Sequence, residues 1–193
     1  METFARPKPF VDNPEYEKTR SVTLETLRNL IATGKIDPPV VELLELFSRV
    51  PHCYTIQSCS GHFVHERQPD EYTTARLAPY RGIVHTVHYR LAYLAFVLEK
   101  SKNGSVLCRD LRTLASRNPG YIQFGSAGWF WEQSVNSYQI QVAPEREKDK
   151  DSFWITYDEA FLLEKVRDLL IRELAAIAHN HIRLAGKFNQ SDI

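Results

Sequence analysis

Tyr54-Thr-Ile-Gln-Ser-Cys-Ser-Gly-His-Phe-Val-His65 combines the pattern of a strand with a run of small polar residues. In its first half, Tyr54, Ile56 and Ser58 share one face and alternate with the residues of the other face, which predicts a buried strand. Small side chains at 58–61 would let the backbone approach a ligand closely. We therefore expect a turn at 58–61 between two structured segments, and we place the candidate functional site there.

Two helices are expected before this stretch. Apolar residues recur at helical spacing from 14 to 33, and Gly34 is a typical residue just after a helix end. Asp37 followed by Pro38 is a typical helix start, because Asp accepts a hydrogen bond at the N-cap and Pro suits the first turn. The second helix is expected to end before Pro51, so that the two form a hairpin leading into the strand.

Periodicity and turn signals predict the remaining segments. Further strands are expected at 82–89, 121–124 and 138–142, and helices at 91–101, at 109–116 and from Thr156 to about residue 183. The last helix has the clearest signal, since Thr156 and Glu159 match a capping box. The segments without such a pattern are an N-terminal arm at 1–13, a loop at 66–80 placed to act as a lid, and a solvated charge run at 145–151.

Strands and helices follow one another without a regular alternation, which favours an α+β fold over a doubly wound parallel sheet. The length of 193 residues suits one domain. We therefore expect a single α+β domain over residues 1–193, with a mixed or antiparallel sheet flanked by helices.

The composition bounds the functional class. No apolar run approaches the roughly 20 residues of a membrane span and no secretory apolar core is present, so we expect a cytoplasmic protein without membrane contact. The 24 basic and 24 acidic residues balance, which disfavours a large nonspecific nucleic-acid footprint. A local basic patch stays possible, because four arginines with few acids nearby follow the motif: Arg67, Arg76, Arg81 and Arg90.

Cys59 has two interpretations. It could act as a nucleophile with His62 or a more distant histidine as its base. Alternatively its small volume permits a tight turn, whose backbone N–H groups form an anion-binding nest. We favour the nest. The other two cysteines, Cys53 and Cys108, have apolar neighbours typical of small core residues, and no CxxC pair occurs.

The histidines raise the question of a metal site. His62, His65, His85 and His88 lie in or near central segments. His85 and His88 are three apart on a predicted strand, however, and point to opposite faces. No carboxylate or cysteine completes a recognisable ligand pattern in the sequence, and we expect no metal. The two histidines at 179 and 181 are expected to lie at a solvated helix end.

Gly125-Ser-Ala-Gly128 resembles a phosphate-binding loop only weakly, because neither a P-loop nor a Gly-x-Gly-x-x-Gly motif is present. Trp129 and Trp131 follow it on alternating positions and would share a face, where they could stack on a base or an adenine ring or belong to the core.

The motif also resembles a known family. Asp37 in Gly-Lys-Ile-Asp, a short helix and then Tyr-Thr-Ile-Gln-Ser-Cys-Ser-Gly is similar to the Taw3/TYW3 family of wybutosine-synthesis enzymes, whose hallmark is Thr-x-Ser-Ser-Cys-Ser-Gly-Arg. Residues 54–61 match closely, and the order of later segments agrees loosely. Two positions depart from the pattern: Gln57 replaces the first Ser of the family, and His62 replaces its Arg.

The resemblance implies a compact Taw3-like α+β fold without the usual methyltransferase sheet. It implies an S-adenosylmethionine-dependent methyltransferase that methylates a nitrogen of a wybutosine precursor in phenylalanine tRNA. Carried over, it makes Ser58, Cys59, His62 and His85 the catalytic candidates, the two histidines as polar contacts or proton acceptor. The candidates for cofactor binding are Ser60, Gly61, Gly125, Ser126 and Trp129.

Two other classes stay open. One is a diverged noncatalytic module that binds a nucleotide or RNA through the motif and the two tryptophans, with an affinity that falls with salt. The other is a small-molecule enzyme that uses Cys59, which a thiol reagent would inactivate and a substrate would protect.

Overall fold

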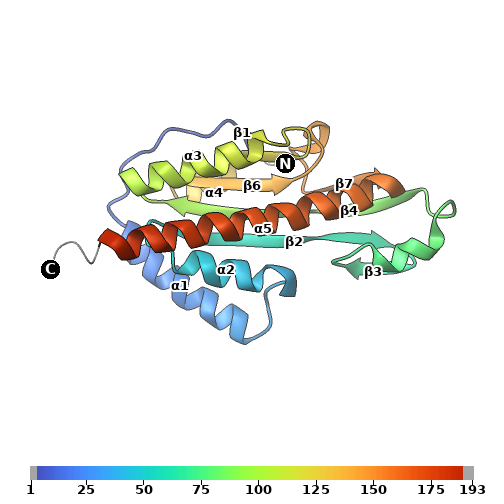
Figure 1. Cartoon of the computed structure of the whole chain (residues 1–193), viewed down its shortest axis with the longest axis horizontal. Coiled ribbons are helices and arrows are strands. Elements are labelled where there is room, and N and C mark those ends of the chain that lie inside the picture. The colour runs from blue at the N-terminus through green and yellow to red at the C-terminus, as the bar shows by residue number, and fades with distance from the viewer. Residues whose placement is uncertain (1–3, 189–193) are drawn as a thin grey trace.

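The computed structural model describes residues 4–188, with the backbone alone at 68–70 and 186–188. In this part of the chain, seven antiparallel strands form one sheet in the order β1-β5-β6-β4-β2-β3, and β7 also pairs with β4 (Figure 1). The strands are β1 (Phe4–Ala5), β2 (Cys53–His65), β3 (Gln68–Glu71), β4 (Thr86–Leu98), β5 (Ile122–Ala127), β6 (Ser137–Val142) and β7 (Ser152–Thr156). The predicted α+β class with an antiparallel sheet is confirmed.

The helices cover both faces of the sheet, unequally. They are α1 (Tyr16–Ala32), α2 (Val41–Ser48), α3 (Lys102–Ser116), α4 (Gly128–Gln133) and α5 (Tyr157–Phe188). The long α5 crosses one face between α2 and α3 and buries the main core there, around Phe47, Leu94 and Leu163 (Figure 1). On the other face, α1 and α4 cover smaller clusters around Val97 and Ala95 and leave the middle of the sheet open.

The expected turn at 58–61 is wrong, because β2 continues through it. Ser58, Cys59 and Ser60 pair with β4 in regular register, after a bulge at Ile56. The small size of these residues has a different structural role here. Gly61 has a φ of 79°, and a Cβ on it would lie 2.8 Å from the Cβ of Ala92 and 3.1 Å from the Tyr89 hydroxyl oxygen. Glycine therefore allows two central strands to approach closely.

The expected strand-to-helix change near residue 90 is also wrong. Residues 91–101 were predicted to be helical, but β4 continues to Leu98 and α3 starts only at Lys102, seven residues before the expected helix at 109. Residues 91–98 are almost all apolar because helices cover this part of β4 on both faces. A continuous apolar run has the same appearance in a buried strand and in a buried helix, so periodicity could not separate them.

Other boundaries agree in part. The two helices before β2 and the strand at 138–142 are confirmed. Of the capping box, the bond to the Thr156 side chain is confirmed, since Glu159 N donates to Thr156 Oγ1 over 3.2 Å. Strand β7, directly after the charge run, was missed, and α5 extends to 188. The loop at 66–80 contains β3 and a short 3-10 helix at Ala75–Tyr80, and the glycine-rich segment 125–131 belongs to β5 and α4.

The N-terminal arm lies along the sheet edge, and its first three residues fall outside the described part. Strand β1 pairs with β5 at Ser126 and Ala127. The N–H of Lys8 donates to Ser126 Oγ over 3.1 Å, and the Tyr138 hydroxyl donates to the Lys8 carbonyl over 2.9 Å. The arm thus closes one edge of the sheet.

A chain of three ionisable side chains joins α3, α5 and the start of β2. His52 Nε2 lies 2.8 Å from His181 Nδ1, and His181 Nε2 lies 3.0 Å from Asp110 Oδ2. Both imidazoles are buried, so the solvated helix end predicted for His181 is wrong, whereas His179 is exposed as expected. Burial, and then the neighbouring His181, lower the pKa of His52 to about 4.

This pKa predicts an acid-sensitive stability. The unfolded chain binds a proton at His52 near pH 6.5, whereas the folded protein does so only near pH 4, so the free energy of unfolding falls as the pH drops through this window. The loss is about 3 kcal/mol for this single group. Urea unfolding between pH 7 and pH 4 should show it, and His52→Gln should flatten the dependence. The same flattening in the exposed control His179→Gln, or none in His52→Gln, would contradict the assignment.

Candidate functional site

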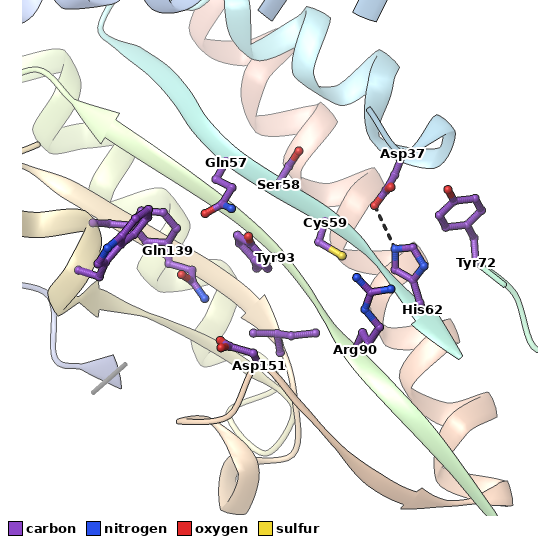
Figure 2. A pocket seen from close by; sticks show the side chains of 13 residues that line it. Asp37, Gln57, Ser58, Cys59, His62, Tyr72, Arg90, Tyr93, Gln139 and Asp151 are labelled. Carbon is purple, nitrogen blue, oxygen red and sulfur yellow. Dashed lines mark ion pairs between the residues drawn. The ribbon is translucent and has the colours of Figure 1, made fainter. Parts of the chain in front are cut away.

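The open part of the sheet forms the floor of a cavity of about 650 Å³ (Figure 2). Its floor comes from the paired strands β2, β4 and β6, and its walls from α4, from Asp37 ahead of α2 and from the segments around residues 72 and 151. The residues that line it are Asp37, Gln57, Ser58, Cys59, His62, Tyr72, Arg90, Leu91, Tyr93, Trp129, Phe130, Gln139 and Asp151.

Asp37 and His62 form a polar pair at one end of the cavity. His62 Nε2 lies 3.4 Å from Asp37 Oδ2, and the same oxygen accepts the Ser60 N–H over 2.8 Å (Figure 2). Asp37 occupies the predicted helix start, but its carboxylate does not cap that helix. The side chain is used by β2 instead, and the His62 ring packs on Tyr72 with 4.9 Å between ring centroids.

The Cys59 thiol lies between this pair and Tyr93, which is its partner on β4 (Figure 2). Burial is the main reason why the pKa of Cys59 rises to about 11, and the Asp37 carboxylate raises it further. The thiol is therefore protonated at neutral pH in the free protein. This disfavours the interpretation of Cys59 as an activated nucleophile, since the thiolate is the reactive form.

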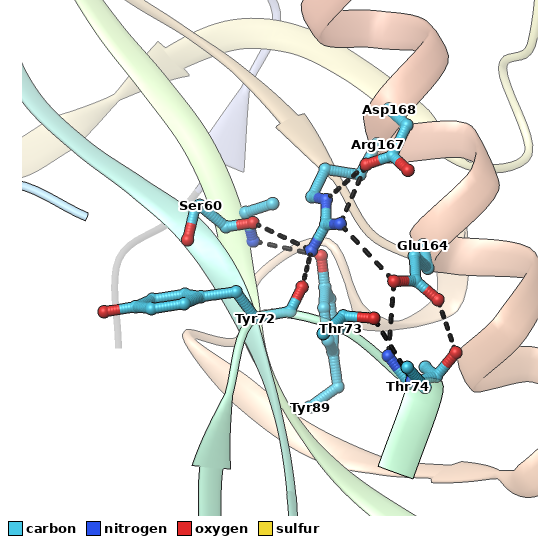
Figure 3. A network of polar contacts seen from close by, with 10 residues as sticks. Ser60, Tyr72, Thr73, Thr74, Tyr89, Glu164, Arg167 and Asp168 are labelled. Atoms are coloured by element: carbon cyan, nitrogen blue, oxygen red, sulfur yellow. Dashed lines mark hydrogen bonds and ion pairs between the residues drawn. The ribbon is translucent and has the colours of Figure 1, made fainter. Parts of the chain in front are cut away.

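A buried arginine holds the back of the site (Figure 3). Arg167 of α5 donates to the carbonyl oxygens of Ser60 and Tyr72, and its guanidinium is paired with Asp168 at 2.8 Å. Glu164, one turn earlier, accepts hydrogen bonds from the N–H and the hydroxyl of Thr74. The last helix thereby fixes both β2 and the segment that places Tyr72 against His62 (Figure 3).

The structure brings some of the predicted residues together. Ser58, Cys59, His62 and Trp129 all line the cavity. The side chain of Ser60 instead faces a small apolar cavity between β2, α2 and α5, and only its backbone N–H contributes to the site, through Asp37. Gly61 is not among the described residues that line the cavity. Its role is to let strands β2 and β4 approach closely.

Three predicted residues lie elsewhere. His85 is exposed before the start of β4, five residues and about 16 Å of strand from Arg90. Gly125 and Ser126 contact the N-terminal arm: a Cβ at Gly125 would meet the Ala5 carbonyl oxygen, and the Ser126 hydroxyl binds Lys8 N–H. The predicted phosphate loop is therefore a strand that receives the arm.

Trp129 and Trp131 do not share a face, contrary to the prediction. The helix α4 turns Trp129 toward the cavity, where half of its surface is exposed. Trp131 packs edge-on against Tyr138, with Lys8 over its ring at 5.1 Å. A strand pattern would align the two rings, whereas in a helix residues two apart point in different directions.

Sequence reasoning missed most of the cavity wall. Tyr72, Tyr93, Gln139 and Asp151 come from four different segments and carry no motif, and Tyr93 was hidden in the segment predicted to be helical. Arg90 was noted only as part of a basic segment. The signal for Asp37 was present, because an aspartate at a helix start was matched by the family pattern.

The lining has a recognisable chemistry. The aromatic residues Tyr93, Trp129 and Phe130 line it, and the amide of Gln139 lies on the floor (Figure 2). Arg90 and the Asp37–His62 pair lie at the opposite end. Flat rings bind planar heterocycles, amides read their edges, and arginine binds carboxylate or phosphate.

Asp37, Cys59 and His62 also form a set of metal-ligand types. One ligand atom of each, a carboxylate oxygen, the thiol sulfur and an imidazole nitrogen, lies within 4.8 Å of the others. The fold thus brings a carboxylate and a thiol next to the His62 imidazole, a ligand set that no spacing pattern in the sequence indicated.

Comparison with solved structures identifies the fold. The PH1069 protein from Pyrococcus horikoshii OT3 aligns over 89% of this chain and 93% of its own, with 10% identity and a TM-score of 0.51. The chain shares the fold of PH1069. A second structure of the P. horikoshii protein (TM-score 0.48, 10% identity, 90% and 95% covered) and a hypothetical protein from Aeropyrum pernix (0.39, 14%, 77% and 98%) are less similar in structure.

The likeness to PH1069 concerns the fold alone, since the identity is 10% and the names of these proteins state no function. No family model matches the chain. No curated protein matches it by sequence. Between residues 4 and 188, no helix combines the length and apolar character needed to cross a membrane.

Proposed function

We propose that this protein is an S-adenosylmethionine-dependent methyltransferase that acts on a nucleoside of tRNA, a wybutosine precursor or a related modified base. The observation that carries the proposal is a single cavity that joins aromatic and amide groups, among them the half-exposed Trp129, to the Asp37–His62 pair at one end. In this proposal the protein works in the cytosol, with tRNA as its partner.

The cofactor suits the aromatic end. Its adenine is a planar heterocycle that would stack on the half-exposed ring of Trp129, while Gln139 binds a ring edge. Its carboxylate would pair with Arg90, on the floor toward His62. Arg90 would take the role of the Arg in the Taw3 motif. His62 occupies that motif position in this chain, and it pairs with Arg90 across strands β2 and β4.

The polar end suits the nitrogen that receives the methyl group. In the transfer, the nitrogen attacks the methyl carbon, the carbon–sulfur bond breaks, its electron pair stays on sulfur, and the nitrogen loses a proton. His62 Nε2 would accept this proton, and Asp37, held by the Ser60 N–H, would stabilise the imidazolium. The fixed position of both groups contributes as much as their basicity.

A noncatalytic module is the second candidate, favoured by the exposed ring of Trp129 and by exposed basic residues between β2 and β4. Arg67 and Arg81 lie in the segment between β2 and β4 and are exposed. Such a module would bind RNA with an affinity that falls with salt and would not need S-adenosylmethionine.

Calorimetric titration with S-adenosylmethionine tests the proposal. We expect micromolar-class binding by the wild type, weakened about tenfold or more in Trp129→Ala, because stacking on one ring contributes about 1–3 kcal/mol. Trp154→Ala is the matched control, since Trp154 is also exposed but lies on β7 against His88. Equal affinity of both variants would place the cofactor outside this cavity, and no heat with the wild type would contradict the proposed cofactor.

A further inference from the structure

Asp37, Cys59 and His62 come from two elements that the fold brings together, and their ligand atoms point to one place. The cysteine and histidine lie on β2, three residues apart, and the aspartate precedes α2 (Figure 2). In a regular strand, residues 59 and 62 would face opposite sides. The left-handed backbone at Gly61 changes the alternation between them and directs both side chains to the same cavity.

The distances fit a shared ion better than a simple ion pair. His62 Nε2 and Asp37 Oδ2 are 3.4 Å apart, which is long for a charge-assisted hydrogen bond. Two ligands at about 2.1 Å from one tetrahedral zinc ion are about 3.4 Å apart. The Cys59 sulfur lies within 4.8 Å of a carboxylate oxygen of Asp37 and of a ring nitrogen of His62.

The ligands are fixed before any ion binds. The Ser60 N–H holds the Asp37 carboxylate over 2.8 Å, and the Ser60 carbonyl is in turn bound by the buried Arg167. The Gly61 N–H lies 3.5 Å from Cys59 Sγ and would stabilise a thiolate there. Contacts of this kind orient metal ligands and are commonly worth a factor of 10–100 in metal affinity.

We propose that Asp37, Cys59 and His62 bind a divalent transition-metal ion of the zinc class, with the fourth coordination position open to the cavity. The mixed sulfur, nitrogen and oxygen set selects zinc or cobalt over magnesium and calcium, which prefer oxygen ligands. A thiolate and a carboxylate neutralise the charge of the ion, and the open position leaves room for a water or a ligand group.

The ion and the proposed methyl transfer compete for one atom. His62 Nε2 cannot hold the metal and accept a proton at the same time, so an occupied site would inhibit the transfer. This consequence depends on the proposed function, whereas metal binding itself does not.

Cobalt substitution and zinc dialysis test the proposal on the intact protein. Addition of Co²⁺ to the wild type should produce a thiolate-to-cobalt charge-transfer band and the intense visible bands of a tetrahedral ion, both displaced by Zn²⁺. Equilibrium dialysis should show one tightly bound zinc per chain, and this equivalent should be lost in Cys59→Ser, His62→Gln and Asp37→Asn. Circular dichroism of each variant confirms that it is folded.

The controls are Cys108→Ser and His88→Gln, which change a thiol and an imidazole outside the cavity and should keep the bound zinc. Three results would overturn the proposal: no cobalt band that depends on sulfur, zinc binding only at millimolar concentration, or a bound equivalent that survives in Cys59→Ser and His62→Gln. Calorimetry with S-adenosylmethionine in a chelator is independent of these results, so failure of either proposal can be recognised separately.

Discussion

Replacement of His62 by glutamine should lower the rate of methyl transfer by about 10²–10⁴-fold, the usual contribution of a positioned acid or base. Glutamine keeps a polar side chain of similar reach at this buried position but cannot take up the proton. The free energy of unfolding should change by less than about 1.5 kcal/mol, since the ring packs mainly on the partly exposed Tyr72. Transfer from labelled S-adenosylmethionine, with a chelator present, measures the rate.

The matched control is His88→Gln. His88 lies on β4 near Arg90, contacts the Trp154 ring at a tilt and does not line the cavity, so its variant should transfer methyl groups at the wild-type rate. A wild-type rate in His62→Gln would remove the histidine from the mechanism. An equal loss in both variants would point to a general disturbance of the sheet.

Replacement of Gly61 by alanine should destabilise the fold by about 2–5 kcal/mol. A left-handed backbone costs a residue with a Cβ about 1–2 kcal/mol, and overpacking adds about 1–3 kcal/mol. The new methyl would meet Ala92 Cβ at 2.8 Å and the Tyr89 hydroxyl oxygen at 3.1 Å. That hydroxyl accepts the Ala92 N–H and donates to the Val142 carbonyl, so moving it also disturbs two hydrogen bonds of the central strands.

Gly34→Ala separates the two causes. Gly34 has a similar φ of 65°, but nothing lies within 4 Å of its Cβ position. It should lose only the backbone contribution of about 1–2 kcal/mol. Urea unfolding with an unchanged slope gives both values. Equal losses in Gly61→Ala and Gly34→Ala would show that the close approach of β2 and β4 has no energetic effect.

The sequence predicted the parts of the fold whose signals are local. The helices around α1 and α2, the strand β6 and the capping interaction of Thr156 follow from periodicity, proline and cap residues. It failed where burial on both faces removes the periodicity. Residues 91–98 are apolar throughout because they form the centre of the sheet, and that position depends on partners far along the chain.

Apart from Trp129, the predicted residues that line the site come from one segment. Ser58, Cys59 and His62 lie on one strand, so the motif could be recognised. The neighbours that give these residues their chemistry come from elsewhere: Asp37 precedes them by more than twenty residues, and Arg167 lies on the last helix. The small residues at 58–61 indicated a close approach correctly, but the approaching group is Tyr89 of β4 and not a ligand.

The most direct measurement is the transfer of a labelled methyl group from S-adenosylmethionine to tRNA isolated from cells that lack this protein, because the unmethylated substrate accumulates there. After digestion to nucleosides, we expect the label in one modified purine nucleoside, and none when His62→Gln replaces the wild type. If the wild-type protein binds the tRNA but no label enters any nucleoside, the proposed methyltransferase function is wrong and the protein is a binding module.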